Sequence, residues 1–273
     1  MDDPNLLLAE VTRLPVQPGA AVRLLWLLDD PQASAGSIGA LIETDPALSL
    51  HVIRMANAPY FGLANRVTSA QRAVAVLGFE TVRALAASTA FDLFSEKGES
   101  VPPRFWPHSL QTAAAAALLA SLVQGAPADA FSTALLHDIG SALMFRRVPR
   151  RYRHVLEQVE RGERSLCAAE REEFGVTHAH VSAGVLDSLH FPPVMCAAVE
   201  MHHLPLDGND PPLALVVAAA SSVAHVAEDG HDVNGDAERL LSLLGMRTDS
   251  LDRLAARVRE ESTALSSFLT APV

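Results

Sequence analysis

The sequence is poor in cysteine and in positive charge, and it lacks long uninterrupted apolar runs. Its two cysteines, Cys167 and Cys196, have no CxxC spacing, which excludes a disulfide framework and indicates a reducing compartment. The 32 acidic residues outnumber the 21 basic ones, for a formal net charge of -11, so neither nucleic acid nor an anionic membrane is an expected partner. The acidic N-terminus MDDPNLLLAEVTR resembles no leader, and charged residues or histidines break every long apolar run. We therefore predict a cytoplasmic protein without a signal peptide or a transmembrane span.

Aromatic residues are also scarce, at 5% of the chain, whereas alanine is abundant and no sustained alternation of apolar and polar residues occurs. This composition predicts an all-α protein. Asp45 and Pro46 form an N-cap and a first helical position, and Thr68 and Ser69 begin another helix that Gly78 closes. The polar segment from 95 to 103 is typical of a connector. We predict two helical lobes that meet at this connector.

The second lobe begins with a segment from Phe105 to Val123 that has almost no polar face, which predicts a buried helix. A second apolar segment, from Ala128 to Phe145, is interrupted only by His137-Asp138 and Gly140-Ser141. Later helices are expected at 165–174, 177–189, 193–203 and 212–228, with two amphipathic helices after 236.

A basic stretch follows the second apolar segment, from 146 to 164. Arginine side chains match phosphate oxygens, so this stretch can contribute phosphate contacts. The alternative, which we favour, is a solvated helix surface with glutamate partners at helical spacing. The candidate phosphate-binding residues are Arg146, Arg147, Arg150 and Arg151.

Histidines are the residues in this sequence that point most directly to chemistry. His137 and Asp138 stand inside the apolar run ALLHDIGSALMF, where a buried carboxylate beside an imidazole costs several kcal/mol unless both are paired or coordinated. A divalent ion satisfies both groups, and this donor pair suits zinc, iron, manganese or nickel. The alternative is a His–Asp hydrogen bond that only stabilises helix packing.

The spacing of the other histidines limits which of them can share a site. His178 and His180 diverge by about 200° around a helix, so at most one of them can face a given point. His202 and His203 diverge by about 100°, so both can line one cavity only if it is wide enough for two ions. His108 stands near the start of the apolar helix, which would carry it into the same core.

The order of these motifs resembles that of the HDOD branch of the HD superfamily of metal-dependent phosphohydrolases, which is related to the HD-GYP enzymes. The first half contains DPALSLHVIRMANAPYFG, and the second contains FWPHSL, ALLHDIG, EFGVTHAHVSAGVL and FPPVMCAAVEMHH. The resemblance implies an HDOD-like domain over 14–230. This domain would comprise an N-terminal helical lobe at 14–100 and an HD-like helical bundle at 104–230, followed by a C-terminal helical extension at 231–273.

The resemblance also implies a metal site with one or two divalent ions, which activate water for attack on a phosphoester in HD enzymes. Asp138 would bridge two ions and act with the metal-bound water, and His180 is an alternative to His178. The implied ligands are His108, His137, Asp138, His178, His202 and His203.

Three departures from the family pattern concern catalysis. Ser141 stands where HD-GYP enzymes carry a lysine, and the Glu and GYP residues that follow their paired histidines are absent from HHLPLDGNDPPL. The last Asp ligand has no counterpart in LALVVAAASSVAHVA, where Ser221 is nearest to the expected place. These departures argue against hydrolysis of cyclic di-GMP.

The resemblance therefore implies a regulatory function. HDOD proteins are described as signalling modules without demonstrated hydrolysis, so we expect a signal-transduction protein that binds signalling proteins or a small phosphorylated ligand and retains a metal site. The alternative is a metal-dependent phosphohydrolase, either a phosphodiesterase or a nucleotide phosphatase. A protein that only holds others together through its helical surfaces would leave the histidine set unexplained.

Overall fold

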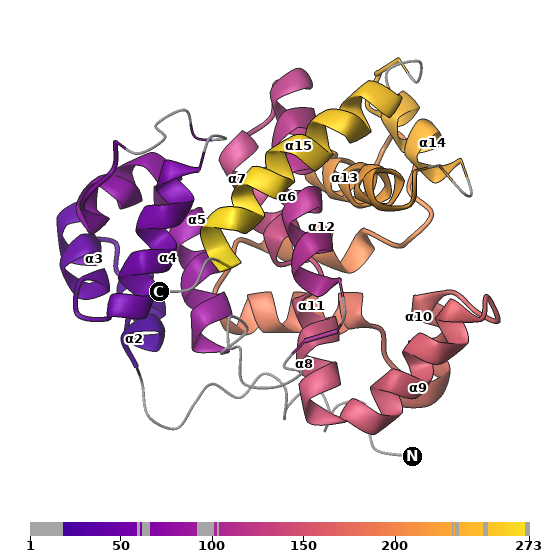
Figure 1. Cartoon of the computed structure of the whole chain (residues 1–273), viewed down its shortest axis with the longest axis horizontal. Helices are drawn as coiled ribbons and strands as arrows, with labels where there is room; N and C mark the ends of the chain where they lie inside the picture. Colours follow the sequence, from indigo (N-terminus) through magenta and orange to yellow (C-terminus); the bar gives the residue numbers. More distant parts are fainter. Residues whose placement is uncertain are drawn as a thin grey trace.

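The computed structural model describes residues 19–58, 61, 66–91, 101–102, 104–230, 232, 235–247 and 251–270, with side chains described as far as residue 263. Within these ranges the chain forms α-helices and no strand, which confirms the predicted all-α class (Figure 1). The helices of the first group are α2 (Ala20–Leu28), α3 (Ala35–Ile42), α4 (Pro46–Asn57) and α5 (Ala70–Ala90).

Local capping explains where these first helices begin. Asp45 accepts hydrogen bonds from the backbone N–H groups of Ala47 and Leu48, and Ser69 caps α5 in the same way. Gly78 has a φ of 76°, which breaks the helical path, but a second helical stretch continues directly, so α5 is kinked rather than ended there. The predicted connector at 95–103 lies mostly outside the described residues.

The second group contains the helices that surround the histidines. They are α6 (Phe105–Leu122), α7 (Pro127–Leu135), α8 (Ile139–Arg147), α9 (Pro149–Glu160), α10 (Leu166–Phe174), α11 (His178–Ser188), α12 (Pro193–Met201), α13 (Pro212–Asp229) and α14 (Asp236–Leu243). Helix α6 packs against both α7 and α13, and its alanines at 113–117 are fully buried. Small side chains allow these helices to approach closely, so the alanine run forms the centre of the bundle.

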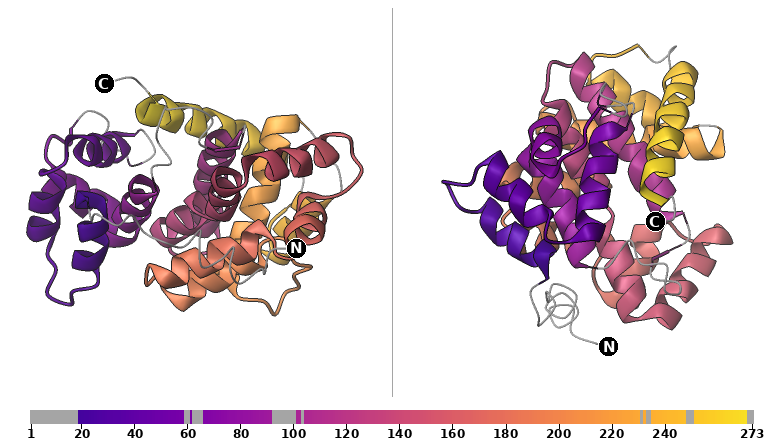
Figure 2. Two further views of the ribbon diagram at one scale, coloured as in Figure 1. Left: turned by 90° about the horizontal axis from the view of Figure 1, so that it is seen from below. Right: turned by 60° about the vertical axis from the view of Figure 1, so that its left-hand side comes forward.

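Two features connect the two groups of helices. Helix α15 (Leu251–Thr270) packs on α6 and α13 and also contacts α4 (Figure 2). From α5, the buried guanidinium of Arg83 donates to Asp29 Oδ1 at 2.7 Å, to the Leu28 carbonyl at 3.0 Å and to the Leu189 carbonyl at 3.1 Å. This arginine therefore ties α2 and α5 to the loop that follows α11.

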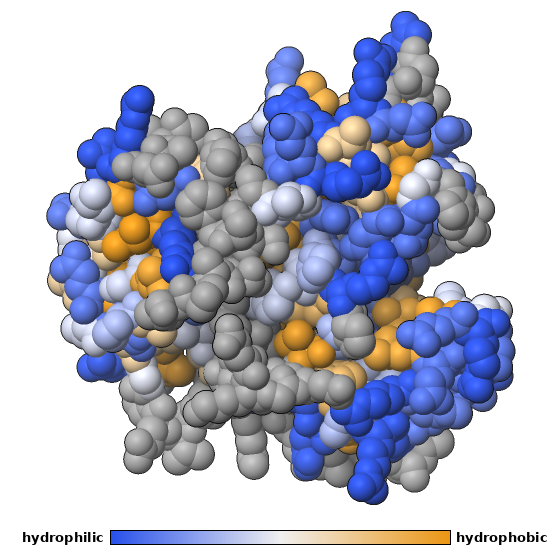
Figure 3. All heavy atoms as spheres, in the orientation of Figure 1, coloured by the Kyte–Doolittle hydropathy of each residue, from blue (hydrophilic) through white to orange (hydrophobic). Residues whose placement is uncertain are grey.

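Two helices, α5 and α13, are long and apolar enough to cross a membrane by length and composition alone. In each, 67% of the apolar window is buried inside the fold, so packing within the bundle accounts for their hydropathy. On the face in Figure 3, hydrophilic residues cover most of α9 and α10.

Candidate metal centre

The predicted histidines and Asp138 lie where the ends of several helices meet. Helix α7 ends at Leu135 and α8 begins at Ile139, so His137 and Asp138 occupy the turn between them. His178 is the first residue of α11, and His202 and His203 follow the last turn of α12. His108 lies in the first turns of α6.

Gly140 allows α8 to approach α11 closely enough to form this site. A Cβ at this position would lie 2.3 Å from the carbonyl oxygen of His178 and 2.8 Å from the backbone nitrogen of Ser182. The backbone N–H of Gly140 donates to Ser182 Oγ at 2.8 Å. A glycine is therefore required here for close approach, and it sets the position of His178 relative to Asp138.

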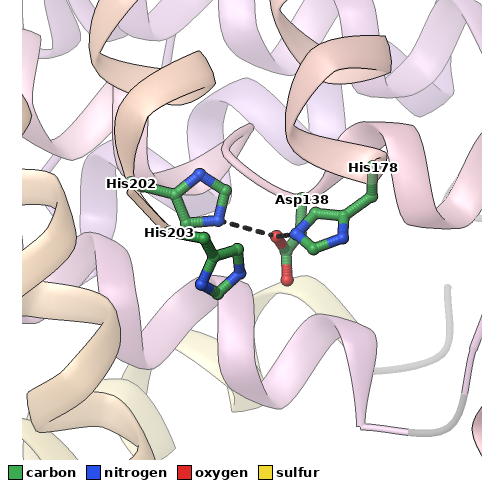
Figure 4. A group of neighbouring side chains, drawn as sticks. All are labelled: Asp138, His178, His202 and His203. Carbon is green, nitrogen blue, oxygen red and sulfur yellow. Dashed lines mark ion pairs between the residues drawn. The ribbon is translucent and has the colours of Figure 1, made fainter. Parts of the chain in front are cut away.

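The carboxylate of Asp138 is at the centre of the cluster (Figure 4). Its Oδ1 lies 3.2 Å from His178 Nε2, 3.4 Å from His137 Nε2 and 3.5 Å from His202 Nε2. Its Oδ2 lies 4.0 Å from His108 Nε2.

These donors form two groups that share Asp138. Within each group the ligand atoms lie within 4.8 Å of one another; His108 and His137 complete one group, and His178, His202 and His203 complete the other. The structure thus brings all six predicted ligands together, in two groups that both include Asp138.

Four of the possible metal-ligating atoms are buried without a hydrogen-bond partner. His137 donates through Nδ1 to the Ala134 carbonyl at 2.7 Å, and His202 donates through Nδ1 to the Val199 carbonyl at 2.6 Å. These bonds leave Nε2 directed at Asp138, and Nε2 of His137, His178 and His202 and Oδ1 of Asp138 are all buried without a hydrogen bond. Such atoms are costly to bury unless something satisfies them. Imidazole nitrogens and a carboxylate oxygen are a common ligand set for divalent transition metals, so the residues fit a metal ion.

A buried carboxylate also contacts the Nδ1 side of His178, opposite the Nε2 atom that faces Asp138. Glu170, on α10, accepts from His178 Nδ1 at 2.7 Å and from the His178 backbone N–H at 2.8 Å. Tyr152 Oη donates to the other oxygen of Glu170 at 2.5 Å. A carboxylate behind a histidine ligand orients the ring and raises its basicity in metal sites. Glu170 therefore belongs to the site, although the stretch EREEF contains three glutamates and spacing alone does not identify the buried one.

The local charges set the protonation states of the cluster. Burial lowers the pKa of His137 to about 3, so its ring is neutral at pH 7. Burial also opposes the charged form of His178, but the carboxylates of Glu170 and Asp138 outweigh it and raise the pKa of His178 well above its usual value. Burial alone would raise the pKa of Asp138, yet the neighbouring His137 and His178 hold it well below its usual value. A metal would have to displace a proton from His178.

Several predicted residues lie elsewhere. The ring of His180 pairs with Glu200 and is 53% exposed, which confirms that only one of the two α11 histidines faces the site. Arg146 donates to the carbonyl of Phe91, and Arg151 pairs with Glu173 at 2.6 Å. The phosphate contacts expected of the four arginines stay a prediction.

Helix α13 has no aspartate at the expected place. There, Ser221 Oγ lies 3.5 Å from His108 Nε2. Two further residues of α13, His225 and Glu228, also approach His108 and were not predicted from the sequence. The ring of His225 stacks on that of His108 with centroids 4.4 Å apart, and Glu228 Oε1 lies 3.2 Å from His108 Nδ1. His225 and Glu228 follow Ser221 by four and seven residues, a spacing that places all three on one helix face and could have identified them.

Comparisons with known proteins bear on the family and the fold. The sequence profile of the HDOD domain matches residues 14–205. A candidate phosphohydrolase from Shewanella amazonensis SB2B superposes with a TM-score of 0.75 at 24% identity, over 96% of this chain and 97% of that one. An HDOD domain protein of Geobacter sulfurreducens superposes with a TM-score of 0.69 at 22% identity, over 97% of this chain and 96% of that one. At these identities the likenesses show the fold.

Two further relatives are longer than this chain. A candidate signal transduction protein of Marinobacter aquaeolei VT8 has a TM-score of 0.70 at 19% identity, over 98% of this chain and 66% of that one. An uncharacterized protein of Treponema pallidum (strain Nichols) is 22% identical over 255 residues, which are 91% of this chain but 49% of that protein. The chain thus spans about half the length of this relative. From the profile match over most of its length, the chain belongs to the HDOD domain family.

Proposed function

We propose that this protein is a regulatory module of signal transduction whose HD-like bundle holds a divalent metal centre and recognises signalling proteins or a small phosphorylated ligand. The observation that carries the proposal is the set of buried Nε2 atoms of His137, His178 and His202, which make no hydrogen bond and converge on Asp138 Oδ1. A protein that used this bundle only as a scaffold would gain nothing from leaving four polar atoms unsatisfied in its interior.

Two substitutions favour regulation over hydrolysis. Ser221 supplies a neutral hydroxyl where the family pattern has a charged carboxylate, so an ion beside His108 lacks one anionic ligand. Ser141 donates to the Asp138 carbonyl at 2.8 Å, so α8 offers no cation where HD-GYP enzymes carry a lysine. A structural neighbour from Marinobacter aquaeolei VT8 is itself named for signal transduction.

Hydrolysis of a phosphoester is the second candidate, because the chain keeps five histidines grouped around Asp138. Two neighbours from Shewanella amazonensis SB2B carry the name of candidate phosphohydrolases, one of them metal-dependent. A bound ion would supply Lewis acidity and lower the pKa of a bound water. In that reaction Asp138 would position the ions, while His137, His178 and His202 would orient them through rings fixed by their Nδ1 hydrogen bonds.

Elemental analysis tests the centre directly. Untagged protein purified without chelator is compared with the His137→Ala, Asp138→Ala double variant and with His180→Ala, which removes a nearby exposed imidazole outside the cluster. We expect one or two ions per chain in the wild type and in His180→Ala, and at least one ion fewer in the double variant. Absence of metal from all three proteins, with equal helicity by circular dichroism, would overturn the proposed centre.

A turnover screen separates the two candidate functions. The loaded protein is incubated with phosphodiesters and nucleotides, beside Asp138→Ala. Regulation predicts no turnover that depends on Asp138. Turnover that disappears in the variant would instead establish the phosphohydrolase.

A further inference from the structure

A third group of metal-ligating side chains lies on the outer side of His108. Glu228 Oε1 is 3.2 Å from His108 Nδ1, and the ring of His225 is stacked on that of His108 with an interplanar angle of 24°. One ligand atom from each of the three residues lies within 4.8 Å of the other two. The group shares only His108 with the two groups around Asp138.

The surroundings of Glu228 make it a suitable anionic ligand. Its side chain is 7% exposed, so the carboxylate is largely withdrawn from water. Arg104 Nη2 holds its Oε2 at 2.8 Å, which leaves Oε1 for the imidazole side, and also contacts Asp229 Oδ1 at 3.1 Å. The carboxylate of Glu228 is therefore already oriented when a cation binds. Arg104 also forms an ion pair with Asp229, which would remain if Glu228 bound a metal.

Access to this group is from solvent. His225 is exposed, whereas the side chain of His108 is 10% exposed. His225 and Glu228 are three residues apart on α13, so they face α6 from one helix surface. Two imidazoles and one carboxylate, with one side open to water, are the donor types of a His₂Glu zinc site, and the ring of His225 would turn out of its stack on His108 to direct a nitrogen at the same ion.

We propose that His108, His225 and Glu228 form an outer binding site for a divalent transition metal of the zinc type, separate from the centre at Asp138. Nδ1 of His108 faces Glu228 while its Nε2 faces Asp138 and Ser221. One neutral imidazole donates one lone pair, so the outer site competes with the Asp138 groups for His108. The carboxylate missing at position 221 is thus replaced by one about two turns further along α13, closer to the surface.

The test is a titration of the full chain with Zn²⁺ and with Co²⁺, whose visible absorption reports its coordination. In the His137→Ala, Asp138→Ala background, which removes donors from both Asp138 groups, we expect one ion still to bind. Adding His225→Ala or Glu228→Gln should weaken that ion at least tenfold and change the Co²⁺ spectrum. His154→Ala is the matched control, because it removes a half-exposed imidazole on α9.

The same variants in the otherwise wild-type chain guard against a background that does not fold. There, His225→Ala should weaken binding of one ion at least tenfold and change the Co²⁺ spectrum, while circular dichroism is unchanged; the total stoichiometry can stay the same because His108 is then free for the Asp138 groups. Unchanged affinity and an unchanged Co²⁺ spectrum in His225→Ala would overturn the outer site. This holds even if Glu228→Gln weakens binding, because Glu228 would then only orient His108. Metal lost from the double variant but untouched by His225→Ala would support the centre at Asp138 alone. Metal lost only with His225→Ala would support the outer site alone.

Discussion

Gly140→Ala is expected to separate α8 from α11 and so to disturb both stability and metal binding. The new Cβ would lie 2.3 Å from the His178 carbonyl oxygen, whereas real Cβ contacts almost never fall below 3.0 Å. The two helices must therefore move apart by about 0.7 Å or more. Because the atom in the way belongs to the backbone of His178, a flexible side chain cannot relieve the clash.

The cost can be estimated from the contacts at this position. Overpacking of this kind costs about 1–3 kcal/mol, and weakening the hydrogen bond from the Gly140 N–H to Ser182 Oγ costs about 1 kcal/mol. The better helix propensity of alanine offsets this loss of stability by up to about 1 kcal/mol. A net loss of about 1–3 kcal/mol corresponds to a fall in Tm of roughly 3–10 °C. Since metal–ligand distances tolerate only about 0.2 Å, we also expect affinity for Zn²⁺ to fall at least tenfold.

Differential scanning calorimetry of the metal-free protein and titration with Zn²⁺ measure these two effects. Gly36→Ala is the matched control, because its Cβ would lie 3.6 Å from the nearest atom, Ser34 Oγ, within a helix as well. That variant should be neutral or stabilised by up to about 1 kcal/mol. A Gly140→Ala protein that melts within about 2 °C of the wild type and keeps its Zn²⁺ affinity would refute the reasoning.

Three other predictions follow from contacts of the site and of the lobes. Glu170→Gln removes the charge behind His178 and should weaken metal binding about 10- to 100-fold, measured by competition with a chelator; an unchanged affinity would mean that Glu170 only stabilises the fold. In metal-free protein, His137 stays neutral down to about pH 3 while the unfolded chain takes up its proton near 6.5, so its contribution to stability is present above pH 6.5 and lost as the pH falls. His137→Gln should therefore reduce the acid destabilisation by several kcal/mol in urea unfolding at pH 7 and pH 4, and parallel curves for the two proteins would contradict the assigned pKa. Arg83→Met should cost about 2–4 kcal/mol in the same assay, because it leaves Asp29 Oδ1 and two carbonyl groups without this donor, while His190 still bonds Asp29 Oδ2 at 2.7 Å; a loss below about 0.5 kcal/mol would show that Arg83 does not join the lobes.

Much of this protein was readable from local sequence. Helix starts at Asp45 and Ser69 were predictable because a cap forms between residues two or three apart. His137 and Asp138 were noted as interruptions of an apolar run, whereas the helix break between α7 and α8 at these residues was seen only in the structure; the motif order indicated the HDOD family. The same motifs pointed to a metal ligand set before any helix was placed.

Tertiary structure decided which side chains complete that set. Glu170 is one of three glutamates in its segment, and the sequence does not distinguish it from the other two. Only the folded structure buries it between Tyr152 on α9 and His178 on α11, to which it is hydrogen-bonded. Glu228 lies 120 residues from His108 along the chain, and only the packing of α13 on α6 brings them together. Caps and apolar faces depend on neighbours within a turn or two, so the sequence carries them directly. Ligand partners depend on how distant helices rotate and pack, and that is settled by burial of the whole bundle.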